Sequence, residues 1–127
     1  MDVAPPRASA REAERIPGLR AQWAGLLLAP AAFFAHLQIG YVLVPRACRY
    51  HQDVWLHVVG VASVLVAGVG LLVAWRVWQE THDVPGDAGG PVPRARFLGA
   101  TGLGVSGLLV LLLIAQWVAA FFISPCQ

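Results

Sequence analysis

Three long apolar segments dominate this sequence of 127 residues. They cover residues 21–44, 54–78 and 97–124, and none of them contains Asp or Glu. A helix needs about 20 predominantly apolar residues to cross the hydrocarbon core of a bilayer, so each segment is long enough to span it. A soluble fold would have to cover three helices that are hydrophobic on every side. We therefore expect an all-α integral membrane protein with three transmembrane helices.

The composition supports a lipid environment and argues against nucleic acid as a partner. Charged residues make up 13% of the chain and hydrophobic residues 57%, whereas an ordinary soluble domain carries about 25% charged residues. The formal net charge is only +2, and binding to nucleic acid needs a strong basic patch. The lipid bilayer is therefore the first partner that we expect.

The polar segments divide the chain into a tail and one membrane domain. Residues 1–20 form a polar N-terminal tail, in which "SARE" at 9–12 fits a capping box and predicts a short interfacial helix over about 10–16; an unstructured tail is the alternative. The tail is too polar to be the start of a cleavable signal, so all three spans should remain in the mature protein. The domain covers residues 21–127, with a flexible Gly/Pro-rich linker at 79–96.

The arginines predict the orientation in the membrane. Segments rich in Lys and Arg stay on the cytoplasmic side. The tail and the 79–96 linker, with the adjacent end of the second span, would share one side and carry seven arginines, against two on the other side. The nine are Arg7, Arg11, Arg15, Arg20, Arg76, Arg94 and Arg96 on the first side and Arg46 and Arg49 on the second. We expect a cytoplasmic N-terminus and a periplasmic C-terminus in a bacterial inner membrane.

The two cysteines should then lie on the same, periplasmic side. Cys48 follows the first span and Cys126 follows the third. Because the periplasm is oxidising, a disulfide between them can form and persist. Two free buried thiols are one alternative. Another is a copper or zinc site made by Cys48, His51 and Cys126, since thiolate and imidazole ligands suit these metals.

Small residues recur at helical spacing on each predicted span, and such faces let membrane helices approach closely. On the second span the spacing is three or four residues throughout. The predicted packing residues there are Gly60, Ser63, Ala67, Gly70 and Ala74. On the first span they are Gly25, Ala29, Ala32 and Gly40, and on the third Ala100, Gly104 and Gly107, with a second pair at Gly102 and Ser106.

His36 is an ionisable residue inside the first span, which makes it a candidate functional residue. The simplest reading is a neutral ring hydrogen-bonded to a backbone or hydroxyl group of a neighbouring helix. Haem b held by His36 and His57 is an alternative. However, an antiparallel hairpin places residue 36 level with about residue 62, so His57 would lie about 8 Å away in depth. It would then either bond to Tyr41 or be an interfacial residue. A quinone site that uses His36, Gln38 or Tyr41 is a further alternative.

No chemistry-bearing pattern points to an enzyme. The spans contain no carboxylate for proton coupling, and no nucleophile is paired with a base. We therefore predict a non-catalytic protein with no catalytic residue and no resident metal.

Several features give the chain a resemblance to a known group of proteins. They are "GLLLAPAAFFAHLQIGYVLVPRAC", with Pro30, His36, Gln38, Tyr41 and the Pro-x-x-Cys of Pro45–Cys48, and the closing "SPCQ" with Pro125-Cys126. In these the chain resembles small three-span membrane proteins that accompany cytochrome c oxidase genes in bacteria. The resemblance implies association with a respiratory complex and no catalytic residue.

The expected function is that of an accessory or structural subunit of a larger membrane complex, one of the electron-transfer or oxidase type. Two other functions stay open. One is a redox subunit that carries haem b on His36. The other is an assembly factor that handles copper through Cys48, His51 and Cys126.

Overall fold

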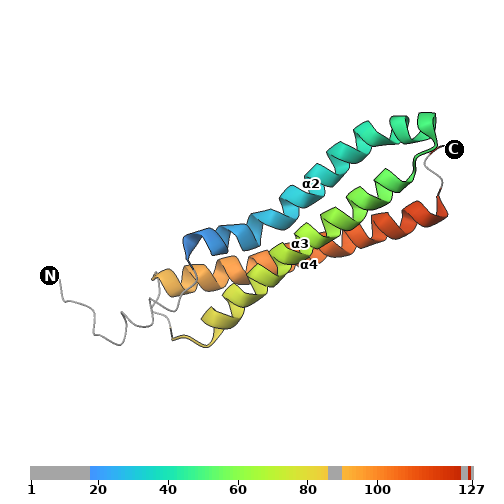
Figure 1. The fold of residues 1–127 in the computed structure, drawn as a ribbon. Helices are drawn as coiled ribbons and strands as arrows, with labels where there is room; N and C mark the ends of the chain where they lie inside the picture. The colour runs from blue at the N-terminus through green and yellow to red at the C-terminus, as the bar shows by residue number, and fades with distance from the viewer. Residues whose placement is uncertain (1–17, 86–89, 124–125, 127) are drawn as a thin grey trace.

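The computed structural model describes residues 18–85, 90–123 and 126, and in this part of the chain it contains three long antiparallel helices. They are α2 (Leu19–Tyr50), α3 (Val54–His82) and α4 (Pro91–Phe122), which lie side by side as an elongated bundle (Figure 1). All three are long and apolar enough to cross a membrane. The predicted helix at 10–16 lies outside the described residues.

The helices extend further than the predicted spans. They contain 32, 29 and 32 residues, so each is about 44–48 Å long against about 30 Å of hydrocarbon. The helix α3 continues four residues past residue 78, and α4 begins at Pro91, six residues before residue 97. The predicted linker is therefore helical at both of its ends. At its other end, α4 stops at Phe122, because Ile123 adopts an extended conformation.

The first helix does not end at residue 44, where the predicted span ends. The helix α2 continues through Pro30 and Pro45 to Tyr50. It ends where His51 turns into the left-handed region at φ 54° and ψ 41°, so that the N–H groups of His51 and Gln52 both donate to the carbonyl of Ala47. This is a helix C-terminus of the left-handed type. A membrane helix tolerates a proline in its interior because its neighbours satisfy or shield the freed backbone groups.

Asp53 stands at the N-cap of α3, but its side chain makes no capping hydrogen bond. Its backbone is already helical, at φ −69° and ψ −18°. A capping side chain normally extends from a β-region backbone. Backbone hydrogen bonds close the turn between α2 and α3, to the Ala47 carbonyl and from Leu56 to the Asp53 carbonyl.

Small side chains form the centre of the bundle, and this allows the three helices to approach closely. Gly25 of α2 packs against Ala74 of α3: a Cβ atom built on Gly25 would lie 3.0 Å from the Ala74 Cα and N atoms. Gly102 of α4 lies against the same two residues. The Ser106 hydroxyl of α4 donates a hydrogen bond of 3.2 Å to the Gly25 carbonyl oxygen and is fully buried.

Burial is unequal along the bundle. We call the end with His82 and Pro91 the linker end, and the end with Cys48 and Cys126 the disulfide end. Towards the disulfide end, none of residues 33–46 of α2 and none of residues 114–122 of α4 is buried. The linker half is therefore tightly packed, whereas the other half is held by fewer contacts.

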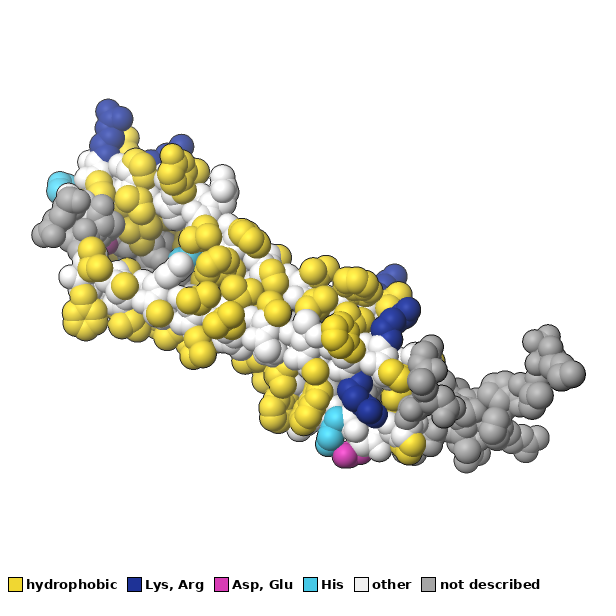
Figure 2. All heavy atoms as spheres, turned by 180° about the vertical axis from the view of Figure 1, so that it is seen from behind, with side chains coloured by type: hydrophobic (Ala, Val, Ile, Leu, Met, Phe, Trp, Pro, Cys, Tyr) yellow, Lys and Arg dark blue, Asp and Glu magenta, His cyan; other side chains and the backbone are white. Residues whose placement is uncertain are grey.

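Apolar side chains cover the outside of the molecule. Figure 2 shows hydrophobic side chains over the middle of one face, with arginines toward both ends. Large side chains such as Leu65, Leu72 and Leu111 are more than 60% exposed. Such a surface is suited to contact with lipid or with other membrane helices, so the chain is a multi-pass membrane protein.

Candidate functional site

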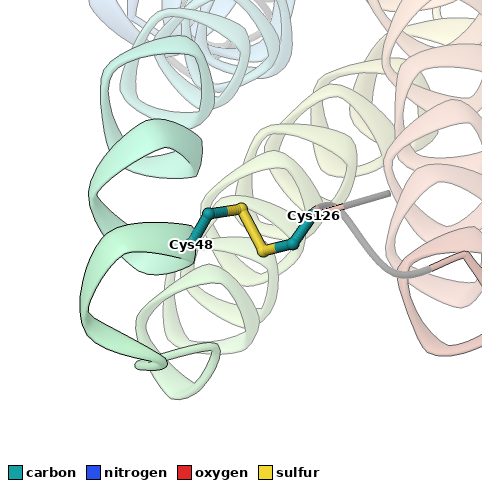
Figure 3. Close-up of a disulfide and its surroundings, with 2 residues drawn as sticks. All are labelled: Cys48 and Cys126. Atoms are coloured by element: carbon teal, nitrogen blue, oxygen red, sulfur yellow. A yellow bond between two sulfur atoms is a disulfide. The ribbon is translucent and has the colours of Figure 1, made fainter.

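Cys48 and Cys126 form a disulfide at one end of the bundle. Their sulfur atoms lie 2.09 Å apart and their Cα atoms 5.4 Å apart, although 78 positions separate them in sequence. Figure 3 shows Cys48 on α2 pointing toward Cys126, which follows the end of α4. Neither cysteine is free. The bond ties the end of α2 to the segment beyond α4.

The disulfide bears on the alternative metal site. Thiolates bind copper and zinc, but the sulfurs of Cys48 and Cys126 are bonded to each other, so both would have to be reduced before they could act with His51. Within the described residues, no three His, Cys, Asp or Glu side chains are grouped so that they could hold a metal ion.

The predicted packing face of α3 lies inside the bundle. All five of its residues are buried: Gly60, Ser63, Ala67, Gly70 and Ala74. Two glycines show why the small size matters. A Cβ atom on Gly70 would lie 3.1 Å from the Ala29 backbone nitrogen, and one on Gly60 would lie 2.8 Å from the Trp117 ring.

The predicted packing faces of the other two helices need correction. On α2, Ala32 is buried, but Gly40 is partly exposed and a Cβ atom there would meet nothing within 4 Å. On α4, Ala100 and Gly104 are exposed. The face of α4 that packs inside consists of Ala95, Gly99, Gly102 and Ser106. Gly102 and Ser106 confirm the second predicted pair. Ala95 was missed because the predicted span began at residue 97, and Gly99 was missed because the main face was drawn through its neighbour Ala100.

His36 is hydrogen-bonded to a neighbouring helix, as the simplest reading of the sequence predicted. Its Nδ1 atom lies 3.3 Å from the Ser63 Oγ atom of α3. The Ser63 hydroxyl in turn donates a hydrogen bond of 2.7 Å to the Val59 carbonyl oxygen. A hydroxyl has one hydrogen to donate. Because Val59 takes it, the Ser63 oxygen must accept from His36, and the Nδ1 atom of His36 carries a proton.

This network fixes the tautomer of the neutral ring. In a neutral imidazole one nitrogen is protonated and the other is a hydrogen-bond acceptor. Since Nδ1 of His36 donates to Ser63, Nε2 carries the lone pair. Nε2 makes no hydrogen bond to any residue that the structure describes.

The depth of His36 bears on the alternative haem site. His36 is level with Ser63, close to the residue 62 that an antiparallel hairpin predicts. His57 lies six residues nearer the disulfide end on α3, which is about 9 Å. The His57 ring stacks on Phe121 of α4, with ring centroids 4.6 Å apart. The two histidines therefore face different neighbours at different depths and do not form a bis-imidazole pair within one chain.

The expected hydrogen bond between His57 and Tyr41 is wrong. Tyr41 is 83% exposed, and the buried Nδ1 atom of His57 has no hydrogen-bond partner in the described structure. The Nε1 atom of Trp117 on α4 is also buried without one, and its ring packs edge-on against Phe121. The His57 ring is therefore held by stacking on Phe121 of α4, and not by a hydrogen bond to α2.

At the linker end, an arginine joins two helices. The Arg96 guanidinium of α4 donates to the Thr81 carbonyl oxygen, with distances of 3.0 and 3.1 Å, and also to the Val84 carbonyl oxygen. These acceptors belong to the last turn of α3 and the residues after it, where helix carbonyls lack intrahelical donors. No sequence pattern predicts this contact, since Arg96 stands in the 79–96 segment, which we expected to be a flexible linker.

Comparisons with protein-family models, with curated proteins and with solved structures found no match to this chain.

Proposed function

We propose that this chain is a non-catalytic accessory subunit of a larger bacterial membrane complex, one of the respiratory or oxidase type. The observation that carries the proposal is the position of Gln38. This polar side chain lies in the middle third of α2 and is exposed on the outside of the bundle.

Gln38 lies about 18 Å from the end of α2 at Tyr50 and about 28 Å from its start at Leu19, which places it inside the hydrocarbon. It makes no hydrogen bond to any described residue. An unpaired amide costs several kcal/mol in an apolar medium. A neighbouring protein that offers hydrogen-bonding groups would remove this cost, so we expect α2 to face another subunit at Gln38.

The position of Tyr41 supports a partner contact on the same face of α2. It lies three residues after Gln38, on the same side of the helix, and it is 83% exposed. Aromatic side chains with a polar tip are enriched in protein interfaces. By contrast, each helix contributes a small residue to the close contacts inside the bundle, Gly25 on α2, Gly70 on α3 and Gly102 on α4. The partner would therefore contact large apolar side chains around Gln38 and Tyr41.

The proposed orientation puts the linker end in the cytoplasm and the disulfide end in the periplasm. Among the described residues, Arg20, Arg76, Arg94 and Arg96 belong to the linker end and Arg46 and Arg49 to the disulfide end. The side with more arginines is the cytoplasmic one. An oxidising periplasm also agrees with the cystine that joins α2 to the end of the chain.

The respiratory type of the partner rests on the resemblance to proteins that accompany oxidase genes. The residues that carry it, His36, Gln38, Tyr41 and Pro45, lie on the half of α2 that is not buried against α3 and α4. We find less support for the two other functions, because His36 and His57 differ in depth and the two sulfurs are bonded.

The substitution Gln38→Leu tests the proposal. It removes the polar group and leaves the bundle core untouched, so we expect the purified chain to keep its fold and to lose most of its co-purifying partner. Gln116→Leu is the matched control, since Gln116 is also exposed but lies only about 9 Å from the end of α4, where an amide can reach the headgroups. If Gln38→Leu retains the same partners in the same amounts, the proposed contact is wrong.

A further inference from the structure

A groove on the outside of α2 lies in the half of the helix nearer the disulfide end and contains hydrogen-bond acceptors. It has a volume of about 440 Å³, which is within the usual range of small-molecule sites. Its lining residues are His36, Leu37, Gly40, Tyr41, Val44 and Pro45. None of these is buried against the rest of the bundle, so the groove opens sideways to the membrane.

The first acceptor is Nε2 of His36. The chain of hydrogen bonds from His36 to Ser63 to Val59 puts the proton on Nδ1 and leaves the lone pair on Nε2. The two ring nitrogens lie on different edges of the imidazole, so Nε2 points away from Ser63. His36 is one of the residues that line the groove.

The second acceptor is the backbone carbonyl of Tyr41. In a regular α-helix the carbonyl of residue i accepts from the N–H of residue i+4. Position 45 is a proline inside the helix, and proline has no N–H to donate. The Tyr41 carbonyl therefore lacks its usual donor, and both Tyr41 and Pro45 line the groove.

Gly40 lies between these two acceptors. A Cβ atom at this position would meet nothing within 4 Å, so Gly40 is not needed for packing within the bundle. A glycine lets a ligand approach the helix backbone closely. With Leu37 and Val44 as apolar neighbours, the groove is suited to a flat ring with an apolar tail.

We propose that this groove binds a lipid-soluble hydroquinone and prefers it to the oxidised quinone. A hydroquinone carries two hydroxyl donors on a flat ring, one for Nε2 of His36 and one for the Tyr41 carbonyl. The quinone carries only acceptor oxygens, which face lone pairs at both positions. Among the lining residues the Tyr41 hydroxyl is the only side-chain donor that is not already engaged, since Nδ1 of His36 donates to Ser63. The proposal concerns binding alone and does not depend on the accessory-subunit assignment.

The tautomer is tested first, by ¹⁵N NMR of the full chain labelled at histidine. The account predicts a neutral His36 with its proton on Nδ1. In Ser63→Ala the acceptor is lost, and the population of the other tautomer should rise. A proton on Nε2 of His36 in the unsubstituted protein would overturn the proposal.

Ligand binding is tested with a decyl-substituted hydroquinone and its quinone, under anaerobic conditions. The readout is partition between nanodiscs with the protein and empty nanodiscs of the same lipid. We expect the hydroquinone to bind about tenfold more tightly, the effect of about one net hydrogen bond. The preference should disappear in His36→Leu and weaken in Pro45→Ala, which restores a donor to Tyr41.

Two controls keep the result interpretable. Gln116→Leu changes an exposed residue of α4 outside the groove and should leave the preference unchanged. Tyr41→Phe removes the hydroxyl, the side-chain donor that is not already engaged, and should preserve or increase the preference for the hydroquinone. Each variant is first checked for an intact disulfide and wild-type helical circular dichroism. Equal partition of both ligands in the unsubstituted protein, preference for the quinone, or an unchanged preference in His36→Leu would each overturn the proposal.

Discussion

Gly102 of α4 lies directly against the backbone of Gly25 of α2: a Cβ atom on Gly102 would be 3.0 Å from the Gly25 carbonyl oxygen. The same carbonyl accepts the hydrogen bond of the Ser106 hydroxyl. This contact lies where all three helices meet, because Ala74 of α3 packs against both glycines. Close approach of the backbones, rather than burial of large side chains, therefore holds the linker half together.

Gly102→Ala should destabilise the bundle, and Gly104→Ala should not. The added methyl group at Gly102 meets a rigid backbone oxygen, so α2 and α4 must separate, at a cost of about 1–3 kcal/mol for overpacking. Gly104 faces open space, and alanine there favours the helix. The check is thermal or denaturant unfolding in detergent. Equal stability of the two variants would contradict the close contact.

Breaking the disulfide should loosen the disulfide end and leave the linker half folded. Only Ala47 is buried on α2 beyond Ala32, so the cystine supplies much of the constraint there. Cys48→Ser should lower stability by less than the roughly 4 kcal/mol that loop closure gives in a free chain. Hydrogen exchange should rise in residues 43–50.

The double variant Cys48→Ser with Cys126→Ser provides the control for this prediction. Both single changes break the same bond, so the double change should cost no more than either one. Additive losses would mean that each cysteine contributes separately, and unchanged exchange in residues 43–50 would mean that packing alone holds this end.

The orientation predicts which cysteines a membrane-impermeant maleimide can reach. In spheroplasts treated with an impermeant reductant, Cys48 and Cys126 should become labelled. In a background without these two cysteines, Asp83→Cys at the linker end should be labelled only after the membrane is permeabilised. The reverse pattern would place the linker end outside and contradict the arginine argument.

Arg96→Ala should increase fraying at the end of α3. It removes the donors to the Thr81 and Val84 carbonyls, hydrogen bonds to a charged group whose loss costs about 1.5–3 kcal/mol at most. Hydrogen exchange of residues 79–84 should rise. Arg94→Ala is the matched control, since Arg94 is exposed on the same turn of α4. Similar exchange in the two variants would show that Arg96 does not hold this end.

The three helices, the cystine pair and the packing face of α3 could be predicted from the sequence because each depends on a strong local signal. Apolar length predicts the spans. Regular steps of three and four residues predict the α3 face, and each cysteine follows the end of a span. The hydrogen bond of His36 to Ser63 also fits the predicted register of the α2–α3 hairpin.

Other features could not be predicted, because they depend on where the backbones of neighbouring helices move apart, and the sequence does not show this. Gly40 continues the small-residue pattern of α2, yet no helix packs on it. Pro45 is a helix breaker in solution, but α2 continues through it. Pro91 was assigned to a loop, although proline at the first helical position is itself a start signal; this is why α4 was predicted to begin six residues too late.

The most direct test of the accessory-subunit account is purification of this chain from its native membrane in mild detergent. A native gel is followed by mass spectrometry of the band that contains the chain. The account predicts a large stoichiometric complex with electron-transfer subunits, which Gln38→Leu depletes and Gln116→Leu does not. A small band that contains this chain alone, unchanged by Gln38→Leu, would contradict it.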